Sequence, residues 1–137
     1  KLRALCMLVS SATLTEIRMS DADLNLLPLV DDGVITALRD IMEEEFADLL
    51  HAFLNDLPVQ IALMQTAVAQ NNADELYQLA HKLKSSCGSL GAPRLAELIH
   101  RLEQAGRLKT LHDATELLRQ THIVAGETVI GLHARIA

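Results

Sequence analysis

The sequence predicts an all-α protein: an antiparallel up-down four-helix bundle with a short N-terminal capping helix. Of its 137 residues, 50% are apolar but only 2% are aromatic, and tryptophan is absent. Leu, Ala, Ile, Val and Met therefore supply most of the apolar side chains, and most of these residues favour helices. Apolar residues also recur three or four positions apart, as on one face of a helix, and short connections join the periodic segments. Short connections make successive helices antiparallel neighbours, and a chain of this length can bury a single core.

The first two predicted helices follow the segment LLPLVDD. Asp31 or Asp32 is expected to cap a short helix, because a carboxylate can accept hydrogen bonds from the first free N–H groups. A long helix is expected over residues 43–69, and Pro58 within it predicts a kink or a break. The run Glu43-Glu44-Glu45 is interpreted as a solvated first turn that the helix dipole favours. The apolar positions are Val34, Ile35, Leu38 and Ile41 in the short helix, and Phe46, Leu49, Leu50, Phe53, Leu57, Ile61, Met64 and Val68 in the long one.

Three further helices complete the predicted bundle. The sequence NNAD caps a helix expected over residues 73–89, and Gly91 followed by Pro93 is a stop-and-restart signal between two antiparallel helices. The last helix is expected over residues 110–135, although Gly126 and Gly131 weaken its pattern. The domain as a whole is expected to span residues 23–137. The apolar positions are Leu95, Leu98, Ile99 and Leu102 in the fourth helix, and Leu111, Ala114, Leu118, Ala125, Val129, Leu132 and Ile136 in the last.

Composition excludes several classes of function. The net charge of −6 argues against nucleic acid as the main partner, because binding to phosphate backbones needs a cationic surface. Cys6 and Cys87 show no metal spacing and give no disulfide framework, which favours a reducing, cytoplasmic setting. Residues 1–22 are expected to form an N-terminal extension or tether. Their basic residues followed by an apolar run also resemble a short signal peptide, and the run is too short to span a membrane. We also expect a monomer.

The stretch LAHKLKSSCGSLGAP stands out on the third predicted helix. On a helical wheel, Lys84, Ser85 and Gly88 fall within about 60° of His81. His81 is therefore expected to face solvent. Asp74, Tyr77 and Gln78 share this side, whereas Leu76, Leu79, Leu83, Ser86 and Leu90 lie on the opposite side with Ala80 and Cys87 at its edges.

These residues suggest phosphoryl chemistry on His81. A neutral imidazole on a rigid helix is a competent nucleophile, and the ammonium of Lys84 can neutralise an arriving phosphoryl group. Ser85 and Gly88 keep the surface low, and a glycine is costly in a helix unless something must approach closely. The sequence shows no Gly-rich phosphate loop, acidic metal cluster or Ser-His-Asp arrangement. We therefore expect no autonomous kinase activity.

The segment AHKLKSSCGSLGA resembles the signature of histidine-containing phosphotransfer (HPt) domains: a His, a Leu two residues on, a Lys, a run of small residues and a closing Gly-Ala. The resemblance extends over residues 31–136. It implies that His81 is the phosphorylated histidine, that Lys84 stabilises the phosphate, and that Gly88 and Gly91 are the close-approach and helix-ending positions. Arg107 lies where some relatives place a phosphate-facing basic residue. Ser85 departs from the family, which commonly has glycine directly after the lysine.

The resemblance implies a phosphorelay intermediate that accepts a phosphoryl group from a receiver-domain aspartate onto His81 and passes it to another receiver. The receivers would supply the acidic pocket and Mg²⁺, and a hybrid sensor histidine kinase is an expected partner. Docking is expected at Tyr77, Gln78, Ser85, Gly88 and Arg107, where Tyr77 either orients the imidazole or only packs on the surface. The alternatives are a helical adaptor that works without phosphorylation and the phosphate-accepting module of a chemotaxis-type kinase.

The remaining histidines show no ligand pattern, so the sequence predicts no metal site. Cys87 is expected to pack rather than react. The histidines concerned are His51, His100, His112, His122 and His133.

Overall fold

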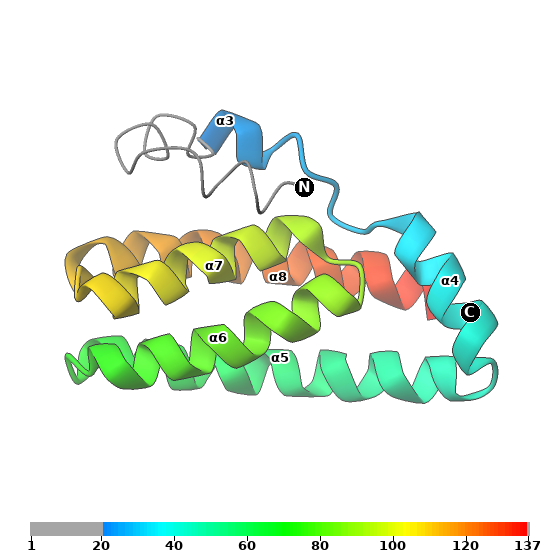
Figure 1. Cartoon of the computed structure of the whole chain (residues 1–137), viewed down its shortest axis with the longest axis horizontal. Helices are drawn as coiled ribbons and strands as arrows, with labels where there is room; N and C mark the ends of the chain where they lie inside the picture. The colour runs from blue at the N-terminus through cyan, green and yellow to red at the C-terminus, as the bar shows by residue number, and fades with distance from the viewer. Residues whose placement is uncertain (1–20, 137) are drawn as a thin grey trace, which may run out of the picture.

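The computed structural model describes residues 21–136, so almost all of the predicted N-terminal extension lies outside the described residues. Four long helices form an antiparallel bundle, and each packs against two of the others (Figure 1). A short helix, α4, covers the end of the bundle where the C-terminus lies (Figure 1). The predicted fold class is confirmed. The elements are α3 (Asp21–Leu24), α4 (Asp32–Met42), α5 (Glu45–Ala69), α6 (Ala73–Ser89), α7 (Pro93–Leu108), the 3-10 turn η1 (Leu111–Asp113) and α8 (Ala114–Ile136).

Two element boundaries differ from the prediction, and the long helix is not broken at Pro58. α5 begins at Glu45 because Glu43 closes α4 instead: its N–H donates to the carbonyl of Arg39 at 2.9 Å, and its φ is 50°. The turn η1 precedes α8, which therefore starts at Ala114 rather than at residue 110. The predicted break at Pro58 is absent, because α5 runs through this residue. Pro58 itself is exposed, while Leu57 and Ile61 on either side anchor the helix in the core.

Two predictions of side-chain burial are wrong. Ile41 was expected on the apolar stripe of α4 but is 79% exposed, because Ile35, Leu38 and Met42 form the side of this helix that packs on the core. Ser86 was expected on the core side of α6 but is exposed. The fully buried Ala80 and Cys87 lie at the centre of that core face, so the buried face of α6 is turned slightly from the predicted one.

Two glycines bring α6 and α7 close together. At Gly106 an added Cβ would lie only 2.7 Å from the backbone N of Tyr77 and 2.9 Å from the backbone O of Ala73, so the two backbones are in direct contact there. Gly91 has a φ of 80°, which glycine adopts without strain, and Pro93 is the first residue of α7. The tight turn at Gly91 and the close contact at Gly106 place α7 next to the face of α6 that carries His81.

The short helix α4 is held at its N-terminal end. Asp31, rather than Asp32, caps it by accepting hydrogen bonds from the backbone N–H groups of Gly33 (3.0 Å) and Val34 (3.3 Å). Asp32 instead accepts from Nε of Arg135 at 2.6 Å, which ties α4 to the end of α8.

No helix within residues 21–136 is long and apolar enough to cross a membrane.

Candidate functional site

His81 projects from the middle of α6 on the side away from the core, and its side chain is 60% exposed. Its ring stacks on the ring of Tyr77 one turn earlier, with the centroids 5.7 Å apart and the planes 20° from parallel. The stack restricts rotation of the imidazole from one side. The structure thus places a histidine that a partner can reach on a rigid helix.

The carboxylate of Glu103 holds the other side of the imidazole. Glu103 comes from α7, and its side chain is only 5% exposed. One carboxylate oxygen, Oε2, is hydrogen-bonded to Nδ1 of His81, and the other, Oε1, accepts from Nζ of Lys84 at 2.5 Å. Nδ1 of His100 lies 3.5 Å from Oε1. A single buried carboxylate therefore joins the exposed histidine, the lysine one turn away and a second histidine.

The ionised state of Glu103 decides which nitrogen of His81 is free. Burial alone would raise the pKa of Glu103, but the hydrogen bonds from Lys84 and His81 outweigh it and hold this pKa below its usual value of 4.5. An ionised carboxylate can only accept hydrogen bonds, so Nδ1 of His81 carries the proton in this arrangement. The lone pair of the neutral ring then lies on Nε2, on the exposed side.

Neither Glu103 nor a role for His100 was predicted from the sequence. A signal for Glu103 existed: it directly follows Leu102 on α7, at the edge of the apolar stripe that packs into the core. Among residues 22–136, Glu103 is the only buried residue that carries a charged side chain. Because a buried carboxylate needs partners, this position is where a polar contact with another helix is expected.

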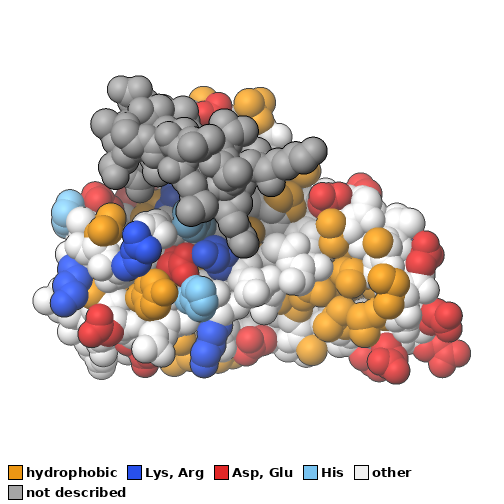
Figure 2. All heavy atoms as spheres, viewed as in Figure 1, with side chains coloured by type: hydrophobic (Ala, Val, Ile, Leu, Met, Phe, Trp, Pro, Cys, Tyr) orange, Lys and Arg blue, Asp and Glu red, His pale blue; other side chains and the backbone are white. Residues whose placement is uncertain are grey.

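The other predicted site residues lie on α6 and α7, and most of them are exposed. Gln78, Ser85 and Gly88 are exposed on α6, and an added Cβ at Gly88 would meet no atom within 4 Å. Arg107 is exposed on α7, one turn beyond Glu103. Lys84 is 33% exposed and is already paired with Glu103, so its ammonium is not free in this structure. Basic, acidic and histidine side chains gather on the face that α6 and α7 form (Figure 2).

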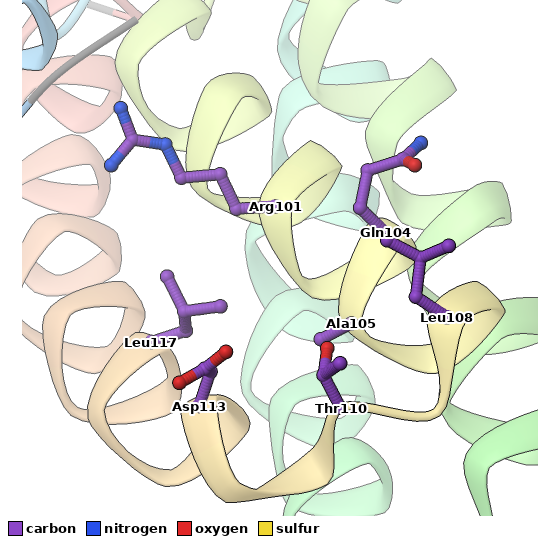
Figure 3. Close-up of a pocket in the computed structure, with 7 residues that line it drawn as sticks. All are labelled: Arg101, Gln104, Ala105, Leu108, Thr110, Asp113 and Leu117. Atoms are coloured by element: carbon purple, nitrogen blue, oxygen red, sulfur yellow. The ribbon is translucent and has the colours of Figure 1, made fainter. Parts of the chain in front are cut away.

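Two hollows lie near α7. One, of about 450 Å³, lies next to the site and is lined in part by Lys84, Gly88, Gly91 and His100. The other, of about 220 Å³, lies between α7, η1 and α8 (Figure 3). Its residues Arg101 and Leu108 are about 140° or more around α7 from Glu103, so this second hollow is separate from His81. It is lined by Arg101, Gln104, Ala105, Leu108, Thr110, Asp113 and Leu117.

Within residues 21–136, no three His, Cys, Asp or Glu side chains lie close enough together to hold a metal ion. The rings of His51 and His133 lie 6.0 Å apart, and these residues are on α5 and α8, away from His81.

Cys87 is fully buried, and burial raises the pKa of its thiol to about 12. We expect Cys87 in the native protein to resist thiol reagents at about pH 8, because the thiolate is the reactive form. The measurement is the reaction with DTNB in a Cys6→Ser background, with and without denaturant. Reaction of the native protein as fast as that of the unfolded protein would contradict the buried position.

Comparisons with known proteins identify the family of this chain. Residues 48–132, which are more than half of the chain, match the Hpt domain. The chain therefore belongs to the Hpt domain family. It is also similar to a crystal structure of histidine-containing phosphotransfer protein B (HptB) from Pseudomonas aeruginosa PAO1. The identity is 28% and the TM-score 0.77, and the match covers 80% of this chain and 95% of that one. A search of curated proteins found no match. The predicted family is confirmed.

Proposed function

We propose that this protein is a phosphorelay intermediate that accepts a phosphoryl group from a receiver-domain aspartate on Nε2 of His81 and passes it to a second receiver. Membership of the Hpt family and the similarity to HptB support a phosphotransfer role. The observation that carries the proposal is the exposed imidazole of His81, whose Nδ1 is held by a buried carboxylate. Ionised Glu103 fixes the tautomer that has a free lone pair on the outer nitrogen.

In the proposed step, the Nε2 lone pair of His81 attacks the phosphorus of the aspartyl phosphate in line. The P–N bond forms as the bond from phosphorus to the aspartate oxygen breaks, and the aspartate leaves as a free carboxylate. The proton on Nδ1 stays shared with Glu103, whose negative charge balances the charge that the ring gains. The receiver supplies Mg²⁺ and the acidic pocket. Transfer to the second receiver is the reverse reaction, and a hybrid sensor kinase would phosphorylate the first.

A panel of phosphorylated receiver domains tests this proposal. We expect at least one receiver to transfer its phosphate to the protein, giving label that is lost in acid and kept in base, as for a phosphohistidine. Phosphorus–nitrogen coupling in NMR should place the phosphate on Nε2. If neither a receiver nor phosphoramidate labels the protein, the proposal fails, and the adaptor alternative explains the fold better.

Lys84→Ala should slow phosphoryl transfer and change the lifetime of the phosphohistidine, because the ammonium lies 2.5 Å from the carboxylate that also holds Nδ1 of His81. The measurement is the decay of labelled protein after the donor is removed. The matched control is Lys82→Ala, since Lys82 is exposed two residues away. If both variants decay like the wild type, Lys84 has only a surface role.

Gly88→Gln should block transfer from a receiver while leaving labelling by phosphoramidate largely intact. The free protein has room for the side chain, since no atom lies within 4 Å of an added Cβ. The substitution should even raise helix stability by up to about 1 kcal/mol. Gly126→Gln on α8 is the control, because that position is equally open and lies on another helix. A normal rate of receiver transfer in Gly88→Gln would show that the low surface is incidental.

A further inference from the structure

The face around His81 continues beyond the low surface of α6 onto an apolar patch. The patch lies on α4 and the first turns of α5, where Leu38, Met42 and Leu49 are half-buried and Ile41 is 79% exposed. Figure 2 shows hydrophobic side chains gathering over this part of the molecule. Beyond Lys84, every exposed residue of α6 is small: Ser85, Ser86, Gly88 and Ser89.

The outer edge of the patch is acidic. Five exposed carboxylates surround the α4–α5 turn, and acidic side chains follow this edge in Figure 2. No ion pair joins them to a basic side chain within residues 21–136. This acidic rim consists of Asp40, Glu43, Glu44, Glu45 and Asp48.

The opposite end of the same face is mainly basic. Arg107 and Lys109 are exposed there, with Asp74 as an acidic neighbour, whereas Lys82 lies beside His81 itself. Any partner that covers the whole face therefore meets positive charge at one end, His81 and small residues in the middle, and an apolar patch with a negative edge at the other.

A partner docked over His81 is large enough to reach the apolar patch. Ser89 lies eight residues beyond His81, which is about 12 Å along α6. A transient protein interface covers about 600 to 800 Å² on each partner, which corresponds to a disc of about 14 to 16 Å radius. A receiver centred on His81 would then cover the small residues and the near side of the apolar patch. The acidic rim lies about 20 Å or more from His81 along the bundle, so it acts on the receiver mainly through its charge.

We propose that the apolar patch and its acidic rim select and orient the receiver: they fit a receiver that presents an apolar surface edged with Lys or Arg. This inference rests on the proposed function and adds to it which kind of receiver is preferred. Complementary charge at the rim of an interface raises the association rate and rejects wrong partners more than it strengthens the final complex. Opposite charges at the two ends of the face also favour one orientation of the receiver.

The test compares Glu44→Gln/Asp48→Asn with a matched control, Glu116→Gln/Glu127→Gln on α8, which changes the net charge equally. Glu44 makes no capping hydrogen bond through its side chain, so neutralising it breaks no such bond. The probes are phosphorylated receiver domains whose surfaces range from basic to acidic. We expect the rim variant to lower kcat/KM by about threefold or more for basic receivers at low ionic strength. The difference should disappear at about 0.5 M salt, where the screening length falls to about 4 Å.

The single-turnover rate at saturating receiver and the labelling by phosphoramidate should not change in the rim variant, and melting curves check its fold. An equal loss in the control pair, or the same loss for acidic and basic receivers, would overturn the inference and leave the proposed function intact. A change in sedimentation of the rim variant without a change in transfer would overturn it in favour of a contact between copies of the chain. Failure of every donor to label His81 would instead overturn the proposed function itself.

Discussion

His81→Gln is expected to abolish phosphate acceptance while changing the free energy of unfolding by less than about 0.5 kcal/mol. The side chain is 60% exposed, so it contributes little to packing, and the glutamine amide can still donate a hydrogen bond to Glu103. The measurements are acid-labile labelling by a phosphorylated receiver and by phosphoramidate, together with unfolding in denaturant. Labelling that persists in His81→Gln would show that another residue carries the phosphate.

Leu83→Ala is the matched comparison on the same helix. Leu83 is only 4% exposed, and its truncation should cost about 2 to 5 kcal/mol by leaving a cavity. The folded fraction of this variant should still be labelled on His81. If His81→Gln were the less stable of the two, the assignment of exposed and buried faces of α6 would be wrong.

Glu103→Ala is expected to slow phosphoryl transfer by about 10- to 100-fold, because a reacting group that loses its orientation pays a penalty of this size. Glu103→Gln should fall between this variant and the wild type, since its amide oxygen can accept from Nδ1 of His81 but carries no charge for Lys84. Glu103 does not touch the phosphorus, so it is a positioning residue. Nitrogen-15 NMR should show the Nδ1–H tautomer of His81 in the wild type and a mixture in Glu103→Ala.

The pH dependence of stability provides a second readout for Glu103. Because the pKa of Glu103 is lowered in the folded protein, the stabilisation by its ionised form is present above the ordinary value of 4.5 and is lost as the pH falls through the lowered value. The free energy of unfolding should therefore fall more steeply below about pH 4.5 in the wild type than in Glu103→Gln. Equal pH profiles and an unchanged tautomer would show that Glu103 neither binds nor orients His81.

Much of the local structure could be predicted from the sequence. The spacing of apolar residues predicted the four long helices, because the residues on the buried face of a helix recur every three or four positions. Gly91 and Pro93 marked the turn before α7, since a positive φ favours glycine and a first helical turn accepts proline. The exposure of His81 also followed from the wheel, because the leucines around it indicated the buried side of α6.

Features that depend on more than one element were predicted less well. The wheel misplaced Ser86, because the exact direction of the buried face depends on how α5 and α7 pack against α6. Ile41 was assigned to the core although α4, being short and near the end of the bundle, buries only the side that carries Ile35. Propensity and periodicity identify a helix but carry no information on its neighbours.

The sequence by itself determined the helical bundle, the exposed histidine and the small residues beside it, because each depends on residues within one or two turns of a helix. Only the tertiary structure decided that Glu103, 22 residues from His81, holds its imidazole. That contact requires the register between α6 and α7, which the backbone contact at Gly106 and the turn at Gly91 set together. A helical period repeats every turn and leaves this register open, so the partner of the nucleophile emerges only when the two helices are packed.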